Sequence, residues 1–145
     1  MLIDYRENTL TPQEYLQMEH LVLEEMTTEE QAKRAISRQL YSVSAYEEEN
    51  LVGIARLVGD GAIYWYVQDV WVLPAYQRKG IGSAMVRMLI RHVKQSSLPG
   101  TNVSLCLMCA KGKEGFYEKL GFAQRPHAWE GAGMEMELEI QEDGV

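Results

Sequence analysis

Apolar side chains follow two different periods along this chain, and each period predicts a different kind of element. Residues 63–74 form a long run rich in aromatic and β-branched side chains, which is typical of a buried strand. Residues 41–46 and 51–58 predict two further strands, and the polar residues 47–50 between them predict a hairpin tip. From residue 81 to about residue 95, apolar side chains recur at helical spacing. Strand and helix signals that alternate in this way predict an α/β fold.

The N-terminal third adds a short strand at residues 2–6 and two helices. Thr11 followed by Pro12 predicts the first helix start, because threonine caps a helix and proline suits the first helical position. Thr28 predicts the second helix start, since acidic residues follow it in the first turn. Residues 133–140 predict a final strand before a charged tail.

Composition fits one domain that spans residues 1–145, because 46% hydrophobic residues can build a single sizeable core. No run is long enough to cross a membrane, and the charged N-terminus does not resemble a secretory signal. We therefore expect a cytoplasmic protein with no membrane partner. A net charge of -7 argues against nucleic acid as the main partner, because phosphate neutralisation needs clustered basic residues. Composition leaves a homodimer open.

Cys106 and Cys109 have the C-x-x-C spacing that metal and redox sites use. Their surroundings, residues 103–109, predict a buried strand, in which residues three apart point to opposite faces. No second pair of cysteines or histidines completes a zinc site. We interpret both residues as core thiols and predict no metal.

Residues 77–82, Gln-Arg-Lys-Gly-Ile-Gly, lie between the long strand and the helix that follows, and this context predicts a phosphate loop. Gly80 and Gly82 let the backbone turn its N–H groups inward, and the helix N-terminus adds partial positive charge. Arg78 and Lys79 add formal charge. The spacing differs from both the Lys-Ser/Thr phosphate loop and the three-glycine dinucleotide fingerprint. The alternative is that the glycines only shape a tight strand-to-helix connection.

A second segment, residues 111–122, reads as a short helix that carries Tyr117, is capped by glycine and leads into a strand. Together with residues 77–82 it resembles the GNAT superfamily of acyl-CoA-dependent N-acyltransferases. The signature of that superfamily is Gln/Arg-x-x-Gly-x-Gly/Ala, followed downstream by a helix with Tyr before Gly-Phe. The resemblance covers about residues 51–122. It implies an α/β fold with a mixed central sheet of about six or seven strands, two of which splay apart, and about four flanking helices.

The resemblance also implies an activity, the transfer of an acetyl group from acetyl-CoA to a primary amine by direct attack in a ternary complex. The acceptor would be a small-molecule amine. Backbone groups of the long strand would pair with the pantetheine arm, and those of the loop would cradle the pyrophosphate. The residues so implied in binding acetyl-CoA are Val70, Trp71, Val72, Gln77, Arg78, Lys79, Gly80, Ile81, Gly82 and Ser83.

Two residues are candidates for proton transfer. Tyr117 matches the general acid of the family, which protonates the departing thiolate; the alternative is that it is an aromatic core residue. Asp69 is our candidate for the general base, because it is a carboxylate within an apolar strand. Its alternative role is to hold a bulge in that strand. If Asp69 is structural, water chains or the carboxylates of Glu24 and Glu25 are the remaining bases.

The chain departs from the family pattern at two positions. Leu105 stands where some relatives that modify protein N-termini have Glu, and Ala110 stands where many have Asn. The first departure counts against a protein-modifying acetylase, and the second removes one polar contact to the cofactor. A non-catalytic acyl-CoA-binding or sensing module is the alternative from another class, although such a module need not retain Tyr117.

Overall fold

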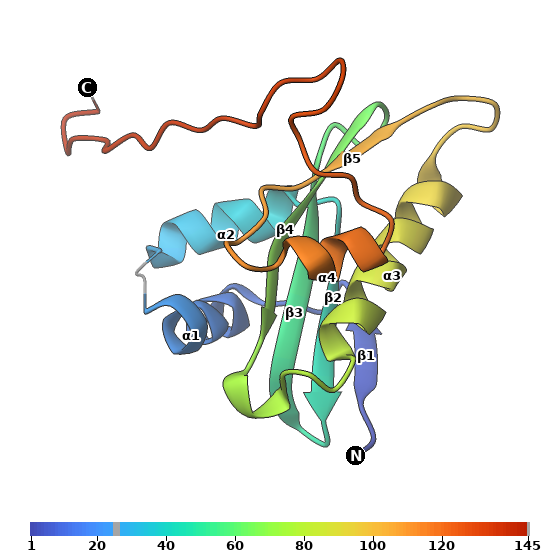
Figure 1. Cartoon of the computed structure of the whole chain (residues 1–145). Helices are drawn as coiled ribbons and strands as arrows, with labels where there is room; N and C mark the ends of the chain where they lie inside the picture. The colour runs from blue at the N-terminus through green and yellow to red at the C-terminus, as the bar shows by residue number, and fades with distance from the viewer. Residues whose placement is uncertain (25–26, 145) are drawn as a thin grey trace. The chain divides into compact units, whose positions relative to one another are not determined.

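A computed structural model describes residues 1–24 and 27–144, and the chain divides into two compact units, Met1–Met108 and Cys109–Val145 (Figure 1). The first unit contains β1 Asp4–Glu7, α1 Pro12–Leu23, α2 Glu29–Arg38, β2 Tyr41–Glu47, β3 Asn50–Gly59, β4 Tyr64–Val72, the 3-10 turn η1 Pro74–Tyr76, α3 Ile81–Ser96 and β5 Ser104–Cys106. The second unit contains α4 Glu114–Lys119. The predicted α/β order is therefore present.

The five strands form one sheet in the order β1-β2-β3-β4-β5, antiparallel except for the parallel pair β4 and β5. The prediction of a mixed sheet is confirmed, but the predicted six or seven strands are wrong. Residues 133–140 have a strand-like alternation, yet no strand forms there or directly after Phe122 in the described part of the chain. A strand exists only where its backbone finds a ladder partner, and period alone does not supply one.

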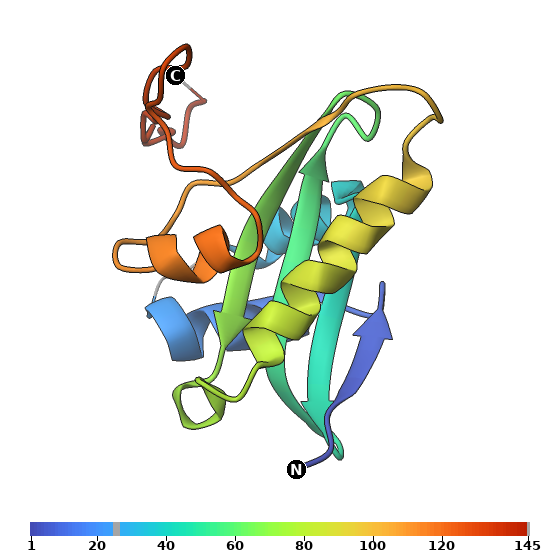
Figure 2. The ribbon, with the colours of Figure 1, turned by 45° about the vertical axis from the view of Figure 1, so that its right-hand side comes forward.

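Helices cover both faces of the sheet in the first unit. Figure 2 shows α3 crossing one face, while α1 and α2 lie behind the other. Gly53 of β3 makes the approach of α3 close, because a Cβ there would lie 3.1 Å from both Met85 Cε and the Trp71 carbonyl oxygen. The start of α3 is thus packed directly over the centre of the sheet.

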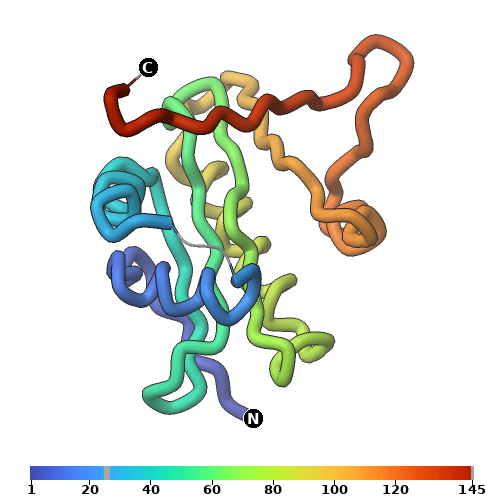
Figure 3. The backbone as a smooth tube through the Cα atoms, turned by 90° about the vertical axis from the view of Figure 1, so that its left-hand side faces the viewer, coloured from blue at the N-terminus to red at the C-terminus, as the bar shows by residue number. Residues whose placement is uncertain are grey.

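Both N-terminal helices begin where the sequence predicts. Thr11 Oγ1 accepts from the Glu14 backbone N–H at 3.1 Å, and Glu14 Oε1 accepts from the Thr11 N–H at 3.0 Å. Thr28 forms the same reciprocal cap with Gln31. These capping boxes satisfy helix N–H groups that have no partner within the helix. The two helices lie side by side, as Figure 3 shows.

The second unit contains the predicted short helix. The backbone N–H of Phe122 donates to the Tyr117 carbonyl at 3.1 Å, and Gly121 adopts φ +103°, a left-handed conformation that suits glycine at a helix end. The glycine-capped helix is therefore confirmed.

The two cysteines are free and lie in different surroundings. β5 ends at Cys106, which is half-buried, so the predicted strand over residues 103–109 is too long. Cys109 follows the strand and is exposed, and the prediction that it is a core thiol is wrong. Within residues 1–24 and 27–144, no group of three or more His, Cys, Asp or Glu side chains is placed to hold a metal ion.

Candidate active site

β4 extends well beyond the end of its neighbour β5. The ladder between them runs from the pair Tyr64 and Ser104 to the pair Tyr66 and Cys106, whereas β4 continues to Val72. Beyond Tyr66, the edge of β4 that faces away from β3 has no strand partner among the residues that the structure describes. This part of β4 contains residues 70–72, where the family resemblance implies pairing with a pantetheine arm.

A β-bulge interrupts β4 at Asp69. The register with β3 passes from the pair Arg56 and Gln68 to the pair Ile54 and Trp71, so two residues of β4 stand opposite one residue of β3. Asp69 has φ +53°, a left-handed conformation that residues other than glycine rarely adopt. The sequence prediction placed a bulge at this residue, and the register agrees with it.

The bulge changes which face of the sheet the following side chains point to. The Trp65 ring lies against His92 of α3, with 6.0 Å between ring centroids. The Trp71 ring lies against Tyr15 of α1 on the other face, at 5.3 Å. In an uninterrupted strand, residues 65 and 71 would share one face. The bulge therefore sets the register of residues 70–72.

Asp69 is held by a buried arginine. Arg56 Nε donates to Asp69 Oδ2 at 2.9 Å, and the side chains are only 9% and 18% exposed. The Tyr15 ring lies beside this pair, with the Arg56 guanidinium carbon 5.2 Å from its centre. Burial, and then the Asp69 carboxylate, raise the pKa of the Tyr15 hydroxyl well above its ordinary value. Sequence reasoning missed Arg56. Its signal was available, because an arginine within an apolar strand requires a nearby carboxylate.

The loop after β4 connects the strand to the start of α3 through two residues with left-handed backbone. Gln77 Nε2 donates to the Val72 carbonyl at 3.0 Å, which ties the loop to the end of β4. Arg78 and Gly80 both adopt left-handed backbone, with φ +63° and +84°. α3 then begins at Ile81 without a side-chain cap and without an acidic residue in its first turn. Its first N–H groups therefore lack both a capping oxygen and a competing carboxylate.

Space is also available at this helix start. A Cβ added at Gly80 would meet no atom within 4 Å, and Arg78, Lys79 and Gly80 are exposed. Gly82 and Ser83, in the first turn of α3, are half-buried. Open space, uncapped N–H groups and two cations suit the pyrophosphate of CoA.

Tyr117 belongs to the second unit, whereas Asp69, the β4 edge and the loop belong to the first. Its ring packs edge-on against Phe116 at 4.9 Å and Phe122 at 5.7 Å between centroids. Burial, and then the neighbouring Cys109 thiol, raise the pKa of Tyr117 to about 12. The hydroxyl is thus fully protonated at neutral pH, as a proton donor must be.

Glu24, Leu105 and Ala110 are the other described positions that the sequence associates with the site. Glu24 ends α1 in a left-handed conformation with φ +58° and is exposed. Glu25 lies outside the described residues. Leu105 pairs with Trp65 in β5 and is half-buried, and Ala110 is exposed.

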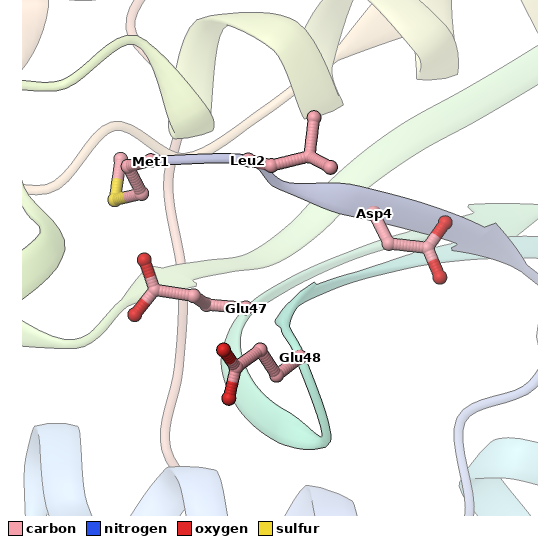
Figure 4. Close-up of a pocket in the computed structure, with 5 residues that line it drawn as sticks. All are labelled: Met1, Leu2, Asp4, Glu47 and Glu48. Atoms are coloured by element: carbon pink, nitrogen blue, oxygen red, sulfur yellow. The ribbon is translucent and has the colours of Figure 1, made fainter.

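A pocket lies beside the β2–β3 hairpin and the first residues of the chain. Figure 4 shows the five residues that line it, which are Met1, Leu2, Asp4, Glu47 and Glu48. None of them is a predicted site residue, and its carboxylates would repel an anionic cofactor. The pocket nevertheless lies beside the residue that precedes the loop, because the Tyr76 hydroxyl donates to Glu47 Oε1 at 2.7 Å.

Comparisons with known proteins match most of the chain to one family and one fold. A family model described as the acetyltransferase (GNAT) family matches residues 7–122, a span that runs through both units. The chain is 31% identical over 94 residues to a Glycine max protein named histone acetyltransferase TAP1, covering 65% of this chain and 39% of that protein. It is 38% identical over 81 residues to an Oryza sativa subsp. japonica protein named serotonin N-acetyltransferase 2, chloroplastic, covering 55% and 38%. The chain thus spans well under half the length of these curated relatives.

A solved structure shows the same fold over nearly the whole chain. It is the crystal structure of a protein of unknown function from meticillin-resistant Staphylococcus aureus, with a TM-score of 0.81 and 23% identity. The superposition covers 94% of this chain and 100% of that one. With the family model matched over most of its sequence, the chain belongs to the acetyltransferase (GNAT) family.

Proposed function

We propose that this protein is an acetyl-CoA-dependent N-acetyltransferase that acetylates a small primary amine by direct attack in a ternary complex. The observation that carries the proposal is one continuous stretch of backbone. Within the described residues, the far part of β4 has one edge without a strand partner. From there the backbone continues through the loop, where Arg78 and Gly80 are left-handed, into the N-terminus of α3, which has no side-chain cap. Such a stretch fits an extended arm that ends in phosphates.

Each part of this stretch has a binding role in the proposal. N–H and C=O groups of Val70 and Val72 pair with the amides of the pantetheine arm on the open edge of β4, as an added strand would. The backbone groups of Trp71, between them, face β3, because the Leu73 N–H donates to the Val52 carbonyl and alternate residues of a strand face the same neighbour. The backbone N–H groups from Arg78 to Ser83 bind the pyrophosphate, and the Arg78 and Lys79 side chains add positive charge. Gln77 holds the loop to β4 through the Val72 carbonyl.

Acetyl-CoA supplies the acetyl group as a thioester, and the protein residues direct its transfer. A β4 backbone N–H next to the bulge polarises the acetyl carbonyl. The amine nitrogen bonds to the carbonyl carbon, the carbon–sulfur bond breaks, and Tyr117 gives its proton to the departing sulfur. The amine loses its surplus proton to a base or to water.

The identity of that base stays a prediction. Asp69 is the candidate from the sequence, but Arg56 already donates to its Oδ2. This contact supports the alternative role of Asp69, which is to hold the bulge. Glu24 is exposed at the end of α1 and remains a candidate.

Substrate class has a second candidate, because one relative is named a histone acetyltransferase and another a serotonin N-acetyltransferase. Leu105, in place of Glu, supports a small amine over a protein N-terminus. A panel of small amines and one lysine-containing histone peptide, assayed with acetyl-CoA by release of free thiol, distinguishes these classes. If the peptide is acetylated and none of the small amines is, protein modification is favoured. If the protein binds CoA but acetylates no acceptor, a non-catalytic module is favoured.

The proposed partners and compartment rest on the composition of the sequence. In the described part of the chain, no helix is long and apolar enough to span a membrane. The net charge of -7 supports the absence of a nucleic-acid partner. A cytoplasmic location and a homodimer stay predictions, and one relative carries the word chloroplastic in its name.

CoA is expected to raise the melting temperature of this protein. A ligand that binds only the folded state at 100 times its dissociation constant stabilises it by about 2.7 kcal/mol, which shifts the melting temperature by several degrees. Intact CoA and dephospho-CoA should both produce the shift in differential scanning fluorimetry, because both retain the pyrophosphate. Absence of a shift with either compound at millimolar concentration would contradict the proposed phosphate site.

A further inference from the structure

Arg56 is a buried cation in the middle of β3, and its partners come from three elements. Its Nε donates to Asp69 Oδ2 on β4 at 2.9 Å, and its Nη1 donates to Gln39 Oε1 after α2 at 3.3 Å. The guanidinium carbon lies 5.2 Å from the centre of the Tyr15 ring on α1. Burying a charge costs desolvation free energy, which hydrogen-bond and ionic partners offset. Because these partners come from three directions, they hold the Arg56 side chain in one position.

The contact with Asp69 acts on a strained piece of backbone. Asp69 has φ +53° at the bulge, and such a conformation persists only where the surroundings over-determine it. The Asp69 carboxylate reaches Arg56 with this backbone in place. The ion pair therefore stabilises the bulged form of β4 over a regular strand.

The bulge in turn sets the register of residues 70–72. Trp65 contacts α3 and Trp71 contacts α1, on opposite faces of the sheet, because the bulge adds one residue between them. If the bulge were lost, a slip of one residue would turn each following side chain, and each N–H, the other way.

We propose that Arg56 is a positioning residue for acetyl-CoA, which holds Asp69 and so keeps the backbone N–H groups of Val70 and Val72 directed to the open edge of β4. The inference rests on the proposed function, since these N–H groups matter only if they bind the cofactor. Arg56 touches neither substrate in this role. It acts through Asp69 and the backbone.

The test measures CoA affinity by isothermal titration calorimetry in the full chain. Arg56→Gln and Asp69→Asn should each raise the dissociation constant roughly 10-fold, the effect of weakening one or two neutral hydrogen bonds. The double variant should raise it no further than the single ones, because both remove the same contact. Arg56→Lys should fall in between, since lysine keeps the charge but not the planar fork. Arg34→Gln is the matched control, because Arg34 forms an exposed ion pair with Glu30 and should leave the affinity unchanged.

The outcomes separate this inference from the proposed function. If the wild-type protein does not bind CoA, the proposed function fails and the inference fails with it. If the wild type binds CoA and folded Arg56 and Asp69 variants bind it equally well, only the inference is overturned. A purely structural role would lower the melting temperature without changing the dissociation constant. If Arg56→Gln does not fold, Arg56→Lys and Asp69→Asn decide by the same criterion. Unchanged affinity in Asp69→Asn, with turnover that recovers as pH rises, would instead identify Asp69 as the base.

Discussion

Replacing Tyr117 by phenylalanine is expected to lower turnover by roughly 10²- to 10⁴-fold, the range typical of lost general acid catalysis. The physical reason is the state of the hydroxyl. Burial and the neighbouring Cys109 raise the pKa of Tyr117 to about 12, so the group carries a proton that a departing thiolate can take. Phenylalanine keeps the ring contacts with Phe116 and Phe122 but has no proton to give. Steady-state kinetics with the best amine of the panel measures the change.

The affinity for CoA and the melting temperature should change little in this variant, because the ring that packs in the second unit is retained. Tyr5→Phe is a suitable control, since Tyr5 lies on the edge strand β1 and also loses a hydroxyl. If Tyr117→Phe turns over like the wild type, Tyr117 is a packing residue and water delivers the proton. Loss of CoA affinity without loss of turnover would contradict the acid role as well.

The dependence of the wild-type rate on pH follows from the same residue. A raised pKa means that Tyr117 stays in its acid form below the ordinary value of 10.0 and loses its proton only as pH rises through about 12. The rate should therefore increase from neutral pH to pH 10 as the amine substrate deprotonates, with no falling limb in that range. A falling limb below pH 10 in the wild type that also appears in Tyr117→Phe would assign the acid to another group.

Local signals in this sequence predict local structure well. Thr11 and Thr28 predict the starts of both N-terminal helices correctly, because a capping box involves residues only three apart. Gly80 gives the turn into α3, because few other residues adopt its backbone conformation. The bulge at Asp69 was also expected, although on the strength of the family resemblance. In each case the determining contacts lie within a few residues or in a recurrent motif.

Features that depend on distant partners were harder to predict. The alternation over residues 133–140 predicted a strand, but a period does not say whether a ladder partner exists. Cys109 was placed in the core because β5 was expected to be longer than it is. Arg56 pairs with a residue 13 positions away on the next strand, and that pairing follows from the register of β3 and β4. Registers are set by the packing of the whole sheet.

Gly80→Val is expected to raise the dissociation constant of CoA by roughly 10²-fold, because hydrogen bonds to a charged group are worth about 1.5–3 kcal/mol each. Valine at this position would disturb the loop in two ways. Its side chain would enter space that is now free of atoms within 4 Å, where the phosphates are proposed to bind. Its backbone would also resist φ +84°, which moves the N–H groups that bind them.

Gly100→Val separates the loss of phosphate binding from simple backbone strain. Gly100 lies in the loop after α3, has φ +79°, and also has no atom within 4 Å of an added Cβ. Both variants should therefore lose a similar amount of stability, about 1–2 kcal/mol for a left-handed backbone in a residue other than glycine. Only Gly80→Val should lose CoA affinity, measured by calorimetry at a temperature where both variants are folded. Equal affinities in the two variants would mean that residues 77–82 form a tight connection between β4 and α3 and that the pyrophosphate binds elsewhere.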